Sequence, residues 1–179
     1  MAQDGQSAKQ QNNKIVRDYI GRFYGDFLFT VGWVSAAAQL FLVSRLMNFF
    51  GVPGSLYFLP MIALFGYSTI SLMPALAIIR LAKIFENSTD YSLQNTARQA
   101  LFLPTTREEK YKAKAAIDTF FIRIGDLLST GLVFLSVQFS LSLTTLTLIN
   151  VILVALWLLL VSGIGRSYRT LMAAPGEKP

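Results

Sequence analysis

Residues 86–118 read ENSTDYSLQNTARQALFLPTTREEKYKAKAAID, and this most polar stretch of the chain lies between two apolar parts. The full sequence of 179 residues is 53% hydrophobic and 15% charged, with a mean hydropathy of +0.48. A soluble domain carries about 25% charged residues. Because the apolar runs have the length of membrane helices, the sequence predicts an all-α membrane protein.

Two residue types that carry much of protein chemistry are absent. The sequence contains no cysteine and no histidine. This excludes disulfides, thiol chemistry, a hydrolytic triad with histidine and nearly all transition-metal sites. We therefore expect that the protein is not an enzyme and that it holds no metal and no cofactor.

The net charge of +6 has a simpler explanation than nucleic acid. The sequence pI is near 9.7, and most basic residues stand at the ends of apolar segments. Anionic lipid headgroups and membrane insertion both favour lysine and arginine there. We expect membrane lipid as a partner and no binding of nucleic acid.

The apolar segments divide into about five spans. Charge-free runs and their flanking residues place them at residues 23–45, 53–72, 74–102, 115–137 and 143–163. Pro53 is suited to open the second span, because the N–H that proline lacks is unpaired at a helix start, and Pro60 predicts a kink within it. Pro104 ends the third span, and Thr106 with Glu109 predicts a capping box that starts the next helix.

Polar segments flank the bundle at both ends. Residues 1–22 are predicted to lie outside the membrane, with a disordered tail at 1–13, and residues 166–179 form a second tail. Basic residues mark the cytoplasmic side, which places Arg45, residues 98–114 and the C-terminus in the cytoplasm. The N-terminus then lies outside although it carries four basic residues before the first span. Either the fifth segment does not span, or the functional protein has further helices upstream, and we favour the second explanation.

One face of the third predicted span is polar. At 100° per residue, its polar side chains fall within an arc of about 100°, and apolar residues such as Ile78 and Leu81 lie off it. An unpaired charge at mid-membrane costs at least about 2.5 kcal/mol, so this polar stripe must face a water-filled cavity or other charged helices. The residues of the stripe are Arg80, Lys83, Asn87, Asp90, Tyr91, Gln94 and Arg98.

Two interpretations of the stripe stay open. In the first, Arg80 and Lys83 attract an anionic solute, and the other polar groups supply hydrogen bonds and a switchable ion pair along a substrate path. In the second, the stripe is an ion-pair network between helices that touches no substrate.

Two other charged groups also have a functional and a structural interpretation. Arg123 and Asp126 are three residues apart in the fourth span, so they can pair with each other, and this structural role is the favoured one. A cytoplasmic cluster either gates the path by pairing with acidic residues elsewhere or only marks the topology. The residues of this cluster are Arg107, Lys110, Lys112, Lys114 and Asp118.

The central stretch also contains a spaced set of residues that is typical of one family. These residues are Tyr91-Ser92-Leu93, Ala100, Pro104, Lys110, Lys112, Lys114-Ala115-Ala116-Ile117-Asp118, Arg123 and Gly125. In this set the chain resembles the ATP/ADP antiporters of obligate intracellular bacteria and plastids, which are nucleotide carriers of the major facilitator superfamily. The resemblance is specific from residue 87 to residue 126.

The resemblance implies that the spans correspond to the C-terminal part of a carrier, which a missing N-terminal half or a partner chain must complete. It implies nucleotide exchange by alternating access across the bacterial inner membrane. Two differences from the antiporters keep alternatives open: residues 94–99 read QNTARQ in place of Phe-Asp-Pro-Thr-Lys-Glu, and Asp126 replaces a lysine after Gly125. The alternatives are a carrier of another anionic solute, or a non-transporting accessory protein derived from a carrier half.

Overall fold

The chain forms stacked helices in the computed structural model, which describes residues 2–173 and the side chains from residue 11 onward. No strand occurs in this part of the chain. Two π-helical turns, η1 and η2, interrupt otherwise α-helical stretches. The elements in order are α1 (Ala2–Phe41), α2 (Val43–Ser55), α3 (Phe58–Leu72), α4 (Leu76–Thr89), η1 (Asp90–Gln94), α5 (Asn95–Ala100), α6 (Arg107–Ala116), η2 (Ile117–Phe121), α7 (Ile122–Gln138) and α8 (Leu143–Ala173).

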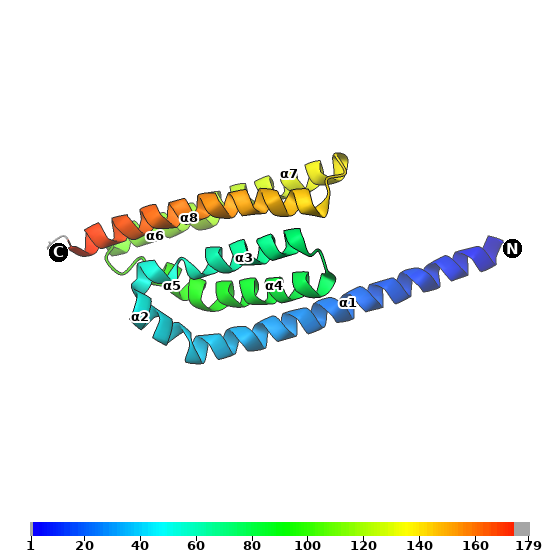
Figure 1. The fold of residues 1–179 in the computed structure, drawn as a ribbon, viewed down its shortest axis with the longest axis horizontal. Coiled ribbons are helices and arrows are strands. Elements are labelled where there is room, and N and C mark those ends of the chain that lie inside the picture. The colour runs from blue at the N-terminus through cyan, green and yellow to red at the C-terminus, as the bar shows by residue number, and fades with distance from the viewer. Residues whose placement is uncertain (1, 174–179) are drawn as a thin grey trace.

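Four of these helices form successive layers. Helix α3 packs between α8 and α4, and α4 packs in turn on α1, as Figure 1 shows. The short helix α2 lies at one end of the layers, where it contacts α5 and α8. Helix α1 runs past the bundle at the other end, toward the N-terminus. This arrangement places α4, η1 and α5, which carry the polar stripe, among neighbouring helices.

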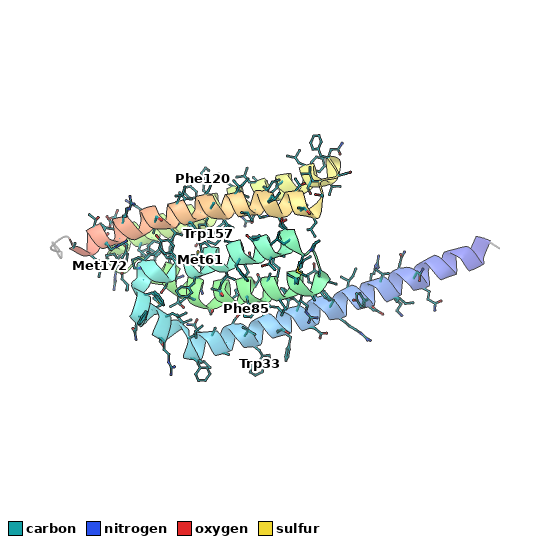
Figure 2. All side chains as sticks on the ribbon, viewed as in Figure 1. Trp33, Met61, Phe85, Phe120, Trp157 and Met172 are labelled. Atoms are coloured by element: carbon teal, nitrogen blue, oxygen red, sulfur yellow. The ribbon has the colours of Figure 1, made fainter. Side chains whose placement is uncertain are left out.

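The buried core lies where the α2–α3 connection, α5 and α8 meet. Leu56, Ala97 and Val161 are each at most 3% exposed, and Trp157 packs against them. Figure 2 shows Trp157 between α8 and α3, whereas Trp33 points away from the bundle. The C-terminal end of the polar stripe is therefore next to the best-buried part of the fold.

Most of the outer surface is apolar. Phe65 is 77% exposed and Leu159 is 70% exposed, and many other large hydrophobic side chains are more than half exposed. Contiguous apolar surface of this extent is unfavourable in water, whereas lipid tails are as apolar as leucine. The protein is an all-α membrane protein, as its composition predicts.

Two helices within residues 2–173 are long and apolar enough to cross a membrane on their own, Arg107–Gln138 and Leu143–Ala173. A third candidate is the pair Gln11–Phe41 and Val43–Ser55, which is bent by 76°. Phe58–Leu72 is a shorter apolar helix. The division of the chain into about five spans stays a prediction.

The structure differs from the sequence prediction near both ends of the chain. Helix α1 begins at Ala2, so residues 2–13 are helical where their composition predicts a disordered tail. Alanine, glutamine and lysine are good helix formers, and the helix is already established by the apolar part of α1. Helix α8 continues to Ala173, so Arg166 and Arg169 belong to a helix, and residues 174–179 lie outside the described part.

The second predicted span is divided between two helices. The predicted start at Pro53 falls inside α2, and α3 begins only at Phe58. Gly51 has a φ of +70°, the left-handed region that favours glycine, and it breaks the regular helix of α2 just before Pro53. Pro60 lies in the first turn of α3, where a missing N–H removes no helical hydrogen bond, so the predicted kink is wrong.

The connection around Pro104 agrees with the prediction. Helix α5 ends at Ala100, and α6 begins at Arg107 with a capping box. The Thr106 N–H donates to Glu109 Oε2 at 2.9 Å, and the Glu109 N–H donates to Thr106 Oγ1 at 3.3 Å. The Thr106 N–H and the Thr106 hydroxyl both donate to the Glu109 carboxylate, and these two hydrogen bonds lower its pKa below the ordinary value of 4.5.

Candidate functional site

The polar stripe does not stay on one face of its helix, contrary to the prediction. In the turn η1 the Asn95 N–H donates to the carbonyl of Asp90, five residues earlier, which adds one residue to the helical turn. The extra residue offsets the regular helical spacing for Arg98, which follows η1, whereas Asp90 and Gln94 lie within η1. The stripe separates into two groups that line two different cavities.

The first group lines a cavity of about 360 Å³ between α1 and α4, which we name the α1–α4 cavity. The Arg80 guanidinium carbon lies 5.2 Å from the centre of the Phe23 ring, a cation–π contact. No acidic group among residues 11–173 forms a salt bridge with Arg80. The residues that line this cavity are Phe23, Tyr24, Phe27, Leu76, Ile79, Arg80, Lys83 and Asn87.

Lys83, in contrast, is fully partnered. Its Nζ donates to Glu86 Oε2 at 2.8 Å and to the Tyr67 hydroxyl at 2.7 Å, and Tyr67 donates to Glu86 Oε1 at 3.4 Å. The Asn87 amide donates to the carbonyl of Lys83 at 2.8 Å. Because Tyr67 lies on α3, these contacts join α3 to α4. Of the two cationic side chains that line the cavity, Lys83 has a counter-charge and Arg80 has none within residues 11–173.

The prediction missed Glu86 and Tyr67 as partners of Lys83. The spacing of Lys83 and Glu86, three residues apart on a helix, is a signal that could have found the first. Tyr67 carries no such signal, because its contact depends on which face of α3 meets α4.

The second group lines a cavity of about 410 Å³ beside η1, α5 and α8, which we name the α5–α8 cavity. Asp90 Oδ1 and Arg98 Nη2 lie 3.6 Å apart, and both side chains are about half exposed. Gln94 is only 6% exposed, and its Oε1 accepts no hydrogen bond from any described residue. The residues that line this cavity are Leu56, Leu59, Asp90, Gln94, Arg98, Leu101, Trp157, Val161 and Ile164.

The remaining residues of the stripe and the predicted ion pair lie elsewhere. Tyr91 is 62% exposed and lines neither cavity. Arg123 and Asp126 are both exposed on α7, and in the described part of the chain no salt bridge joins them. Helix α7 makes its main contacts with η2, so few neighbours are near these two side chains.

The predicted cytoplasmic cluster is tied to α5 through one lysine. Lys114 Nζ donates to Gln99 Oε1 at 2.7 Å and lies 5.9 Å from the centre of the Phe102 ring. Lys112 pairs with Glu108 at 2.6 Å, a contact between two largely exposed side chains. Arg107, Lys110 and Asp118 form no salt bridge within residues 11–173.

The two cavities differ in the polar groups that they present. Within the described side chains, no group of three or more acidic, histidine or cysteine residues is placed to hold a metal ion. The α1–α4 cavity offers one uncompensated cation beside aromatic rings. The α5–α8 cavity is balanced in charge and offers an unpaired amide above apolar walls.

Comparison with known proteins shows which family the sequence matches. The sequence pattern described as TLC ATP/ADP transporter matches residues 15–168. The ADP,ATP carrier protein 1 of Chlamydia pneumoniae is 28% identical over 167 residues, which cover 80% of this chain and 32% of that carrier. The ADP,ATP carrier protein 1 of Chlamydia trachomatis is 28% identical over 123 residues, which cover 58% of this chain and 23% of that carrier. The chain thus spans at most about a third of these relatives. No solved structure matches it.

Proposed function

Because the chain belongs to the TLC ATP/ADP transporter family, whose pattern covers most of it, we propose that it works as part of a carrier that exchanges ATP for ADP across a membrane. The mechanism is alternating access, in which one half of a carrier moves against the other around a central site. In this proposal the chain is the C-terminal part of a major facilitator carrier in the bacterial inner membrane, with its C-terminus in the cytoplasm.

The observation that supports an anionic substrate is the uncompensated charge of Arg80 in the α1–α4 cavity. An unpaired cation within an apolar helical bundle raises the free energy of the folded protein. Such a residue is therefore expected to have a function and to face water, a ligand or a counter-charge. The neighbouring Lys83 is already matched by Glu86. A nucleotide phosphate is a counter-charge that Arg80 can bind through two parallel hydrogen bonds.

A complete transport path needs more protein than this chain. The relatives are about three times its length, and alternating access requires two bundles with a cavity between them. The partner in the proposal is therefore an N-terminal half, on the same polypeptide or on another chain. The exposed residues Arg107 and Asp118 and the partly buried Lys110 are candidates for a cytoplasmic gate that pairs with that half.

The test is nucleotide exchange by the native polypeptide that contains this chain. Bacterial cells that express it are expected to take up labelled ATP in exchange for internal ADP. Arg80→Gln is expected to reduce this uptake about tenfold or more at equal protein level, because a charge-assisted hydrogen bond contributes about 1.5–3 kcal/mol. Arg45→Gln, which replaces an exposed arginine of α2 that lines neither cavity, is the matched control and is expected to keep full uptake.

One observation favours the alternative of an accessory protein that does not transport. Lys83, Glu86 and Tyr67 hold α3 and α4 together and leave Lys83 little freedom to bind a solute. The size of the native polypeptide separates the two functions, measured with an antibody to residues 166–179. A band more than twice the 19.9 kDa of this chain supports a complete carrier, and a band at 19.9 kDa together with absent uptake supports the accessory protein.

A further inference from the structure

Helix α7 has little packing of its own in the bundle. It belongs to the stretch Arg107–Gln138, which is long and apolar enough to cross a membrane, and no residue in the most apolar window of this stretch is buried. Every residue from 115 to 131 is exposed, and the main contacts of α7 are with η2, which directly precedes it. The other long apolar helix, α8, packs on α3 and α2. Within residues 2–173, α7 thus presents its surface to the outside.

The polar side chains in the body of α7, from Arg123 to Ser136, lie on one face of the helix. Four residues of this face follow one another at alternating steps of four and three residues, which is the spacing of a seam between two packed helices. These residues, which we name the α7 seam, are Ile122, Asp126, Ser129 and Val133. The opposite face is apolar and suited to lipid, and its residues are Ile124, Leu127, Leu128, Gly131 and Leu135.

Two charges on the seam face have no partner in the described chain. Arg123 and Asp126 are both exposed, and no salt bridge to either side chain occurs within residues 11–173. An unpaired charge that faces hydrocarbon is unfavourable, and charged residues of membrane helices nearly always face other protein or a water-filled cavity. The spacing of the seam and the unpaired charges are independent observations, and both indicate a protein partner on the same face.

The partner that these residues fit is a second copy of the chain. Copies with the same orientation in the membrane are related by a two-fold axis, so their α7 helices run parallel and equivalent seam residues meet. Arg123 of each copy then lies one helical turn from the level of Asp126 of the other, and two reciprocal ion pairs leave no net charge. A helix of another sequence would need an acidic and a basic residue at matching levels, whereas a second copy supplies both by symmetry.

The small residues beside these charges favour the same interface. Gly125 and Ser129 are four residues apart, and small residues at this spacing let two membrane helices approach closely. We propose that the protein forms a homodimer through the α7 seam, with reciprocal Arg123–Asp126 ion pairs between the two copies.

The test is disulfide cross-linking of the native polypeptide that contains this chain, in its own membranes. The 179 residues contain no cysteine, and any cysteine outside them is replaced by serine, so one introduced thiol is the only one. After mild oxidation, Ser129→Cys is expected to run at twice the mass of the reduced polypeptide. Ile124→Cys, on the opposite face of α7, is the matched control and is expected to stay at the single mass.

Two outcomes of this measurement would overturn the proposal. If further helices of a longer polypeptide cover the seam, Ser129→Cys stays at the single mass. Equal cross-linking at both positions would show collisions between copies without a defined interface.

Two glycines of α7 offer a matched pair for the close approach of the helices. A Cβ built on Gly125 or on Gly131 meets no other group within 4 Å, so neither glycine is required by the packing of the described chain. In the Ser129→Cys protein, Gly125→Leu is expected to lower the cross-linked fraction severalfold, because it crowds the edge of the seam. Gly131→Leu lies on the opposite face and is expected to leave this fraction unchanged. Equal effects of the two substitutions would contradict the seam.

A charge exchange tests the reciprocal ion pairs, again in the Ser129→Cys protein. Arg123→Asp places only acidic charges on the seam face, and Asp126→Arg places only basic ones. Each variant alone is expected to lose about tenfold of its cross-linking, because like charges then meet across the interface. Both substitutions in one chain, or the two single variants expressed together, restore opposite charges and are expected to restore cross-linking. No loss in the single variants, or no recovery in the combinations, would overturn the pairing.

The dimer goes beyond the proposed function and fails separately from it. Nucleotide exchange by a polypeptide that shows no cross-link at Ser129→Cys keeps the carrier and removes the dimer. Cross-linking that follows the charge exchange, in a polypeptide that exchanges no nucleotide, keeps the dimer and removes the carrier.

Discussion

The two cavities differ although one helical stretch lines both of them. In the α1–α4 cavity the polar groups are satisfied and one charge is in excess, because Glu86 and Tyr67 serve Lys83 but not Arg80. In the α5–α8 cavity the charges of Asp90 and Arg98 balance and an amide is unsatisfied. The same kinds of residue thus leave a charge without a counter-charge in one place and a carbonyl oxygen without a hydrogen bond in the other. To describe what a cavity can bind, its net charge and its unpaired hydrogen-bonding groups therefore have to be considered separately.

The largest effect is expected from removing the helical irregularity that separates the cavities. Deletion of Tyr91 from η1 should restore a regular α-helix and turn α5 relative to α4. Ala97, which is fully buried, then leaves the core, and Gln94 leaves its cavity. We expect a strong loss of thermal stability in detergent.

Tyr91→Ala is the control for this deletion, because it keeps the number of residues and changes an exposed side chain. It is expected to leave the melting temperature near that of the unchanged protein. If the deletion has as little effect as the substitution, η1 does not set the direction of α5.

The next effect concerns the walls of the two cavities. Leu56 is 3% exposed in the wall of the α5–α8 cavity, and Leu56→Ala is expected to lower the free energy of unfolding by about 2–5 kcal/mol. Leu76 lines the α1–α4 cavity at 62% exposure, so Leu76→Ala is expected to cost much less. Denaturant unfolding in detergent measures both, and equal losses would contradict the difference between a core wall and a peripheral wall.

A smaller effect is expected from the ion pair that distinguishes Lys83 from Arg80. Glu86→Gln leaves Lys83 without its counter-charge in a partly exposed place, which is expected to cost about 1–2 kcal/mol. Glu108→Gln breaks a pair of similar length between side chains that are 76% exposed, and it is expected to change stability by less than about 0.5 kcal/mol. Thermal unfolding of the two variants side by side measures this difference. A larger loss of stability for Glu108→Gln would show that the exposed pair, and not the pair of Lys83, stabilises the fold more.

The smallest effect is expected outside both cavities, at the start of α6. Thr106→Ala removes the cap and is expected to cost about 1 kcal/mol at neutral pH. Since the pKa of Glu109 is lowered in the folded protein, its contribution is present above the ordinary value of 4.5 and is lost as the pH falls through the folded pKa. The difference in melting temperature between the two proteins should therefore shrink in acid. A difference that grows as the pH falls would show that Glu109 is not the partner of Thr106.

The sequence predicted a large part of the fold through local signals. The apolar composition, the capping box of Thr106 and Glu109, and the helix end before Pro104 each depend on a few neighbouring residues or on simple counts. The errors arose where local signals compete. Pro60 predicts a kink only if the helix begins more than one turn before it, whereas α3 begins at Phe58 and Pro60 lies in its first turn.

The sequence alone determined that the protein belongs in a membrane, that it is helical, and that the stretch around residues 80–98 concentrates the polar side chains. Only the tertiary structure decided how these side chains are used. The stripe is divided because α1 covers one part of it and α8 adjoins the other, α3 brings Tyr67 to Lys83, and α8 places Trp157 beside the cavity that Gln94 lines. The physical reason is that periodicity tells which residues share a face of one helix, whereas the pairing of a buried charge or amide depends on distant segments that pack against that face.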